Sequence, residues 1–269
     1  MSTTVRTRMS ALSIGSGVEE IISHATRRPV VGQIVGTFSH GAYARFDGEL
    51  MAIGTSKIPA GPLHMIATGG ALGCTEGSEV CLTPDVLFAG NSKIDLTEAS
   101  TWSPQFPSSD SLSAIGERLA DVVEFDSMIP SELKVIWTPV VDAVAADNLD
   151  AARVLLEGRG SGLTPAGDDV LAGLLLIDAC CRREVSDAIR RQEVADAVRS
   201  TNLSRAFLKW AARGHSIEPV HRLIEVASTG TVAEVRSAVV AVARIGSSSG
   251  VSLICGLALG SWPVVAARR

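Results

Sequence analysis

One stretch of the sequence is the most informative about fold and function: Gly158-Arg-Gly-Ser-Gly-Leu-Thr-Pro-Ala-Gly-Asp-Asp169. Four of its first ten residues are glycines, which permit positive φ values and a close approach of the backbone to other groups. The segment that follows, Val170 to Cys181, has no polar side chain before Asp178. A helix that is apolar on nearly every face must be buried. The stretch therefore predicts a glycine-rich loop that leads into a buried helix from Asp169 to Arg183.

A glycine-rich loop at the start of a helix is suited to binding an anion. It presents backbone N–H groups and the positive end of the helix dipole. The stretch is not a Walker loop, because it lacks Gly-Lys-Ser/Thr and follows a predicted helix rather than a strand. We expect an anionic substrate to bind at Gly160, Gly162, Thr164 and Gly167.

The two carboxylates at the end of this loop, Asp168 and Asp169, have three possible roles. They can cap the helix and complement its dipole. They can bind Mg²⁺, which prefers oxygen ligands. They can act as a general base or orient a nucleophile. Because capping needs only one aspartate, we favour function, with both residues as candidate catalytic groups and possible Mg²⁺ ligands.

A second loop repeats this architecture. Gly246-Ser-Ser-Ser-Gly250 precedes another apolar helix, predicted from Val251 to Leu259. If the two helix starts face each other, they form a pocket rich in N–H and hydroxyl donors, with Ser248 and Ser249 as donors to a carboxylate or phosphate. The alternative is that one of these serines only caps the helix.

Ser204 is a further candidate substrate-binding residue. It lies in Thr201-Asn-Leu-Ser204, directly before a predicted amphipathic helix from Leu203 to Arg213. An N-cap by Thr201 or Asn202 is the stronger interpretation of this segment.

The first part of the chain is predicted to form strands. Short β-branched and apolar runs alternate with turns such as Ser39-His-Gly41 and Asp47-Gly48. Before them, Ser16 and Glu19 have the spacing of a capping box for a helix to about Arg27. The predicted strands are Val30–Phe38, Ala42–Phe46, Leu50–Ile53, Leu63–Thr68, Glu79–Thr83, Val86–Ala89 and Ile94–Leu96. Close turn spacing favours an antiparallel barrel or sandwich.

The composition changes at residues 100–110, which are rich in serine and proline. We place a linker there and predict an α+β protein, with a mostly β domain at residues 1–108 and a helical domain at residues 109–269. Further helices are expected at Leu112–Glu124, after Thr138-Pro139, at Leu149–Glu157 after Asp147 or Asn148, at Glu218–Ala227, and from the Thr231–Glu234 capping box to Arg244.

Composition limits the class of protein. With 24 basic and 29 acidic residues, a nucleic-acid-binding surface is not expected. The five cysteines contain no C-x-x-C pair, which favours core cysteines in a reducing compartment. The run Val251–Ala267 is interrupted by serine, glycine and proline, so it predicts a buried helix rather than a membrane span. We expect a cytoplasmic protein, and the mean hydropathy of +0.28 indicates an oligomer or a stable partner.

The motif Gly160-Ser-Gly-Leu-Thr-Pro-Ala-Gly-Asp-Asp169 resembles the G-x-G-L-T-P-x-G-D-D hallmark of a bacterial family that includes the AllH subunit of oxamate carbamoyltransferase. Residues 94–104, 201–204 and 246–250 support the resemblance. It implies a β domain before a helical domain, partner subunits, and carbamoyl transfer in the catabolism of purine nitrogen. The substrates it implies, carbamoyl phosphate and oxamate, are small anions.

The second loop departs from the family pattern, G-H-T-S-G-x-D. Ser247 stands at the histidine position and Ser252 at the aspartate position. We therefore weigh a catalytic carbamoyltransferase subunit against a non-catalytic, anion-binding or scaffold subunit whose chemistry is on a partner chain. A third hypothesis is an unrelated Mg²⁺-dependent phosphoryl-transfer enzyme that uses the two aspartates.

Overall fold

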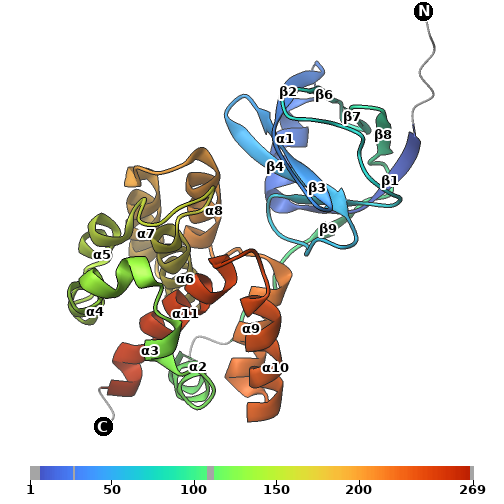
Figure 1. The fold of residues 1–269 in the computed structure, drawn as a ribbon. Coiled ribbons are helices and arrows are strands. Elements are labelled where there is room, and N and C mark those ends of the chain that lie inside the picture. Colours follow the sequence, from blue (N-terminus) through green and yellow to red (C-terminus); the bar gives the residue numbers. More distant parts are fainter. Residues whose placement is uncertain (1–6, 27, 108–111, 267–269) are drawn as a thin grey trace, which may run out of the picture. The chain divides into compact units, whose positions relative to one another are not determined.

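The chain forms two compact units, Met1–Ser103 and Pro104–Arg269. The computed structural model describes residues 7–26, 28–107 and 112–266. The first unit is a β-barrel and the second is helical (Figure 1), so the predicted α+β class is confirmed. The predicted boundary between residues 108 and 109 lies outside the described residues.

Eight strands of the first unit close into a barrel, because β1 pairs with β8 on one side and with β5 on the other. A ninth strand, β9, pairs with the end of β1. The strands are β1 (Thr7–Gly15), β2 (Val30–Phe38), β3 (Gly41–Phe46), β4 (Glu49–Thr55), β5 (His64–Ala67), β6 (Glu79–Leu82), β7 (Val86–Ala89), β8 (Ser92–Asp95) and β9 (Ser100–Trp102). Inward side chains such as Phe46, Met51 and Met65 fill the core.

The barrel is mixed rather than purely antiparallel. The pairs β1–β8, β1–β9 and β4–β5 are parallel. Hairpin turns in the sequence identify antiparallel neighbours, whereas a crossover leaves no such local signal. Two of the strands in these pairs were not predicted: β1 lies before the first recognised element, and β9 occupies the start of the predicted linker.

Helix α1 (Ser16–His24) follows β1 without a connecting loop, and the predicted capping box is wrong. Its N-cap is Gly15, with no side-chain cap hydrogen bond. A Cβ atom on Gly15 would lie 2.0 Å from the Gly61 carbonyl oxygen, so only glycine fits this crowded junction. The Glu19 carboxylate instead accepts a hydrogen bond from the Thr101 hydroxyl.

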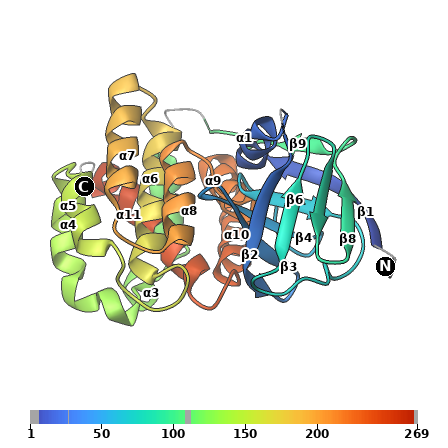
Figure 2. The ribbon, with the colours of Figure 1, turned by 90° about the horizontal axis from the view of Figure 1, so that it is seen from above.

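The second unit consists of ten α-helices and one 3-10 helix within the described residues. They are α2 (Leu112–Ala120), α3 (Phe125–Met128), η2 (Ser131–Ile136), α4 (Trp137–Ala145), α5 (Leu149–Leu156), α6 (Ala166–Cys181), α7 (Val185–Ala197), α8 (Asn202–Ala212), α9 (Glu218–Thr229), α10 (Val232–Ala243) and α11 (Ser249–Ala266). Helices α6 and α11 lie at its centre, with α4 and α5 on one side and α9 and α10 on the other (Figure 2). No helix in the described ranges is long and apolar enough to cross a membrane.

Several predicted helix starts are confirmed, and one is wrong. Asn148 caps α5, Thr201 caps α8, and Thr231 forms the expected capping box with Glu234 on α10. Helix α4 begins at Trp137, so Thr138 lies inside the helix and is not its cap. Helix α7 was not predicted, because its many charged and exposed residues gave no clear apolar periodicity.

The contact between α6 and α11 is made by glycines. A Cβ atom on Gly173 would lie 2.4 Å from the Leu253 carbonyl oxygen, and one on Gly256 would lie 2.1 Å from that of Val170. Farther along, Gly260 lies against Ile177. The contacting residue numbers rise together, so the two helices run in the same direction and begin at the same end of the unit.

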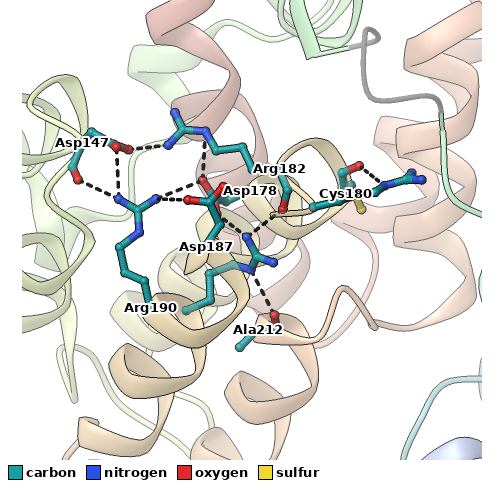
Figure 3. Close-up of polar contacts among 9 residues, drawn as sticks. Asp147, Asp178, Cys180, Arg182, Asp187, Arg190 and Ala212 are labelled. Atoms are coloured by element: carbon teal, nitrogen blue, oxygen red, sulfur yellow. Dashed lines mark hydrogen bonds and ion pairs between the residues drawn. The ribbon is translucent and has the colours of Figure 1, made fainter. Parts of the chain in front are cut away.

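A charged network surrounds the other end of α6 (Figure 3). Asp178 accepts a hydrogen bond from the buried Arg191 guanidinium at 2.8 Å and forms ion pairs with Arg182 and Arg190. Asp147, in the turn before α5, pairs with the same two arginines, Arg182 and Arg190. The network ties α6 to α7 and to that turn, and its arginines complement the negative end of the α6 dipole.

We predict that Gly256→Ala destabilises the helical unit, because the new methyl group meets a backbone carbonyl that cannot move without shifting α6. Overpacking of this kind should lower the free energy of unfolding by about 1–3 kcal/mol in chemical denaturation. Gly260→Ala is the comparison variant, because its Cβ would lie 2.4 Å from Ile177 Cγ2 and 3.3 Å from Leu174 Cδ2, so side chains rather than a carbonyl must move and the loss of stability should be smaller. A Gly256→Ala protein as stable as the parent would contradict the close packing.

Candidate functional site

The glycine-rich loop has a backbone that only glycines adopt easily. Gly158, Gly160 and Gly162 have φ values of +68°, +110° and +92°. A Cβ atom on Gly167 would lie 2.0 Å from the Leu156 carbonyl oxygen, and its N–H donates to the Arg159 carbonyl at 2.8 Å. Gly167 thus allows the loop to fold back on α5, while Gly160 and Gly162 lie on the exposed part of the loop.

Asp168 closes the loop. The side chain is buried, with 2% exposed. Its Oδ1 accepts a hydrogen bond from the Gly158 N–H at 2.8 Å, and its Oδ2 accepts one from the Ser200 hydroxyl. Both carboxylate oxygens therefore hold structure together: one joins the two ends of the loop, and the other joins the loop to the connection before α8.

Asp169 lies where the two predicted loops meet. The Thr164 and Ser249 hydroxyl oxygens are 3.0 Å apart, and both hydroxyls hydrogen-bond to the Asp169 carboxyl. Thr164 precedes α6 and Ser249 begins α11, so the parallel contact of these helices brings the loops together. Asp169 is buried, with 8% exposed, and its Oδ2 has no hydrogen-bond partner among the described residues. Ser248 is exposed, and its carbonyl accepts the Ser252 N–H at 3.0 Å.

The surroundings of Asp169 favour its neutral form. Burial raises its pKa to about 7, hydrogen bonds from Ser249 and Thr164 lower it, and the neighbouring Asp168 raises it. The group is thus able to give or take a proton near neutral pH.

A third helix begins at the same place. The Thr201 side chain caps α8 by accepting the Ser204 N–H at 3.1 Å, and its hydroxyl donates to the Leu163 carbonyl of the glycine-rich loop at 2.5 Å. The Ser204 hydroxyl is buried and has no hydrogen-bond partner in the described part of the chain, and the same holds for Ser252 in the first turn of α11.

The first turns of three helices therefore each contain one buried polar atom without a partner. The atoms are Asp169 Oδ2 on α6, Ser204 Oγ on α8 and Ser252 Oγ on α11. Buried polar groups are nearly always hydrogen-bonded, so such a group indicates a bound molecule or a functional role. Three helix N-termini also concentrate N–H groups and positive dipole ends beside the exposed loops.

This arrangement suits an anion better than Mg²⁺. Both oxygens of Asp168 are already used, and Asp169 has a raised pKa, which weakens its affinity for a cation. Across the residues that the structure describes, there is no group of three His, Cys, Asp or Glu side chains placed to hold a metal ion. We therefore assign no chemical step to Mg²⁺.

Two cavities lie elsewhere in the chain. One, of about 530 Å³, lies between the turn before α5 and helix α7. Its charged lining residues are Asp147, Asp150, Glu193 and Arg190. The other, of about 250 Å³, lies at one end of the barrel. Neither of these two cavities is lined by residues 158–169.

Two residues of the site were not among the predicted ones. Ser200 binds Asp168 across 32 residues of sequence, a contact that no local pattern indicates. Ser252 attracted notice only because it replaces an expected aspartate, although its spacing of three from Ser249 and four from Gly256 places it on the α6 side of α11.

We predict that Asp168→Ala destabilises the fold, because it removes both hydrogen bonds that close the loop. Hydrogen bonds to a charged group contribute about 1.5–3 kcal/mol each, and the expected loss in free energy of unfolding is about 2 kcal/mol or more. Asp168→Asn keeps the acceptor for the Gly158 N–H and should lose less. Equal stability of Asp168→Ala and the parent in chemical denaturation would show that the carboxylate does not hold the loop.

We also predict that Asp169 makes the free energy of unfolding depend on pH. Its pKa is raised from 3.8 to about 7 in the folded protein, so the native state binds more protons than the unfolded state between these values. Its contribution to stability is complete below the lower value and is lost as pH rises through the upper one. Asp169→Asn should therefore gain stability relative to the parent across this interval, on the order of 4 kcal/mol. A stability difference independent of pH would show that Asp169 titrates normally.

One family of known proteins matches this part of the chain. Residues 156–261 match the family model described as oxamate carbamoyltransferase subunit AllH. No curated protein and no solved structure is significantly similar to the chain. The matched segment contains the glycine-rich loop, the start of α8 and the start of α11. The resemblance expected from the loop motif is thus confirmed, and residues 156–261 are similar to the AllH subunit family of oxamate carbamoyltransferase.

Proposed function

We propose that this chain is the AllH-type subunit of a carbamoyltransferase, and that its helical unit binds a small anion at the starts of α6, α8 and α11. The ligand would be carbamoyl phosphate, oxamate or a similar molecule. The observation that carries the proposal is the contact of Thr164 and Ser249 with the buried Asp169, which joins the two donor-rich loops at one place. The family match covers every residue of this contact.

The exposed amides of Gly160 and Gly162 would bind the anion, together with the hydroxyls of Thr164, Ser204 and Ser249. Preset N–H and hydroxyl donors stabilise negative charge as it develops on the reacting oxygen atoms, which is usually the largest catalytic contribution. Asp168, whose two oxygens hold the loop closed, is assigned a positioning role.

Asp169 would accept the proton that the attacking acceptor releases. When an acceptor N–H group attacks the carbamoyl carbon, a new N–C bond forms and the C–O bond to phosphate breaks, with its electron pair leaving on phosphate. The acceptor must then lose a proton. A carboxyl group with a pKa of about 7, and with one oxygen unpaired, is suited to accept it. In the reverse direction the same group returns the proton.

A second candidate is a non-catalytic subunit that only binds the anion. Serines at positions 247 and 252 stand where the resembled family has histidine and aspartate, so the second loop contributes no charged group. In this case the reaction would take place on a partner subunit. The word subunit in the family description supports partner chains in either case, and we propose a role in purine nitrogen catabolism.

The test is a calorimetric titration of the full chain with carbamoyl phosphate, followed by a carbamoyltransferase assay with its partner subunits. Ser249→Ala should weaken binding about ten-fold, as expected for loss of one charge-assisted hydrogen bond. Asp169→Asn should keep binding but lower turnover by about 100-fold or more. Ser237→Ala, an exposed serine on α10, is the control and should change neither.

Each outcome decides between the proposals. Binding that survives in Ser249→Ala at full strength would place the anion elsewhere. Full turnover in Asp169→Asn, with binding still dependent on Ser249, would support the non-catalytic subunit. No binding in the presence of all partner subunits would overturn the anion site.

A further inference from the structure

A cavity of about 250 Å³ lies at one end of the β-barrel. Strands β4 and β5 are parallel, so their carboxyl ends, at Thr55 and Ala67, lie at the same end. The turn between β2 and β3 also lies there, because Gly41 pairs with Gly54 near the end of β4. Loops that leave four neighbouring strands therefore surround this cavity, whose lining residues all belong to the first unit, and its assignment does not rest on the function proposed above.

The side chains that line the cavity carry positive charge and hydroxyl groups. Lys57 and His40 lie on it, together with the hydroxyl groups of Thr37, Ser39 and Thr55, whereas no Asp or Glu among the described residues lines it. Lys57 follows β4 in a turn closed by the hydrogen bond from the Ile58 N–H to the Thr55 carbonyl, at 3.0 Å. No ion pair of Lys57 is recorded in the described part of the chain, so its charge is available to a ligand.

A second loop rich in glycine, residues 69–74, also lines the cavity. Gly69 and Gly73 have φ values of +91° and +63°. Before the loop, the Thr68 N–H donates to the Ser10 carbonyl at 2.8 Å; within it, the Ser92 hydroxyl donates to the Leu72 carbonyl at 2.9 Å. Within the described ranges, the backbone N–H groups of residues 69–73 donate no hydrogen bond. The contacts of Thr68 and Leu72 hold the loop in place, so these N–H groups are available to a ligand.

We propose that this cavity binds a small molecule of the phosphate class, either inorganic phosphate or a phosphate monoester. Lys57 supplies the charge partner, and the amides of residues 69–73 supply further donors. Several donors around one cavity suit an oxyanion, and successive backbone N–H groups form anion-binding concavities in other proteins. The cavity, of about 250 Å³, is also lined by Phe38, which would contact a small organic group.

The test follows the amide NMR resonances of Gly69, Gly70 and Gly73 in the full chain during titration with inorganic phosphate and, separately, with phenyl phosphate. We expect saturable shifts of these amides, and chloride at the same ionic strength should not produce them. Tighter binding of phenyl phosphate would identify a monoester as the ligand, whereas equal binding would identify inorganic phosphate. Shifts that do not saturate, or that chloride reproduces, would overturn the proposal.

Matched variants test Lys57 and the loop of residues 69–74 separately. A Cβ atom on Gly70 has no neighbour within 4 Å, so Gly70→Asp and Gly70→Asn should both fold. The aspartate should abolish binding by repulsion, while the asparagine of the same shape should not. Lys57→Met should weaken binding about ten-fold and Lys57→Arg should restore it. Lys93→Met, on β8 and away from the cavity, is the control. Equal affinities of the two Gly70 variants, or of Lys57→Met and the parent, would contradict the assigned site.

Discussion

The structure of the helical unit depends on the glycine contact between α6 and α11. Because Gly173 and Gly256 leave no room for a side chain, the backbones of two apolar helices touch, and they run in the same direction. Parallel helices in close contact place their N-termini side by side. That single constraint brings Thr164 to Ser249 and sets both beside the buried Asp169. Helix α8 joins them through the Thr201 hydroxyl, which binds the carbonyl of Leu163.

The aspartates at the two ends of α6 differ in how completely they are paired. At its C-terminal end, Asp178 is surrounded by three arginines that bind it and cover the negative end of the helix dipole. At its N-terminal end, Asp168 is fully paired, but Asp169 keeps an unpaired oxygen at the cost of a raised pKa. Natural proteins retain such unfavourable groups mainly at functional sites. The difference between these neighbouring aspartates separates the residue that maintains the loop from the one able to act on a substrate.

Local patterns in the sequence predicted the helix starts around this site. Thr201, Asn148 and Thr231 were among the predicted caps, because capping depends on residues three apart, whereas anion binding at the glycine-rich loop stays a prediction. From the sequence, a pocket between the two loops depended on the two helix starts facing each other, and the contact of Thr164 with Ser249 shows that they do.

Contacts between distant residues were not predictable in the same way. The parallel strand pairs of the barrel, including those of the unpredicted β1, have no turn between them to reveal the pairing. The Ser200 hydroxyl reaches Asp168 only because α8 packs on α6. Helix α7 was missed because its role is to carry Arg190 and Arg191 to Asp178, and such a helix lacks a regular apolar stripe.

The central claim is that the starts of α6 and α11 form one anion site. The most direct measurement is a titration of the full chain with oxamate, followed through the backbone amide resonances of both loops. The account predicts that the amides of Gly160, Gly162 and Ser248, which lie on the exposed parts of the two loops, shift together and give one common Kd. A response confined to one loop, or two clearly different Kd values, would contradict it.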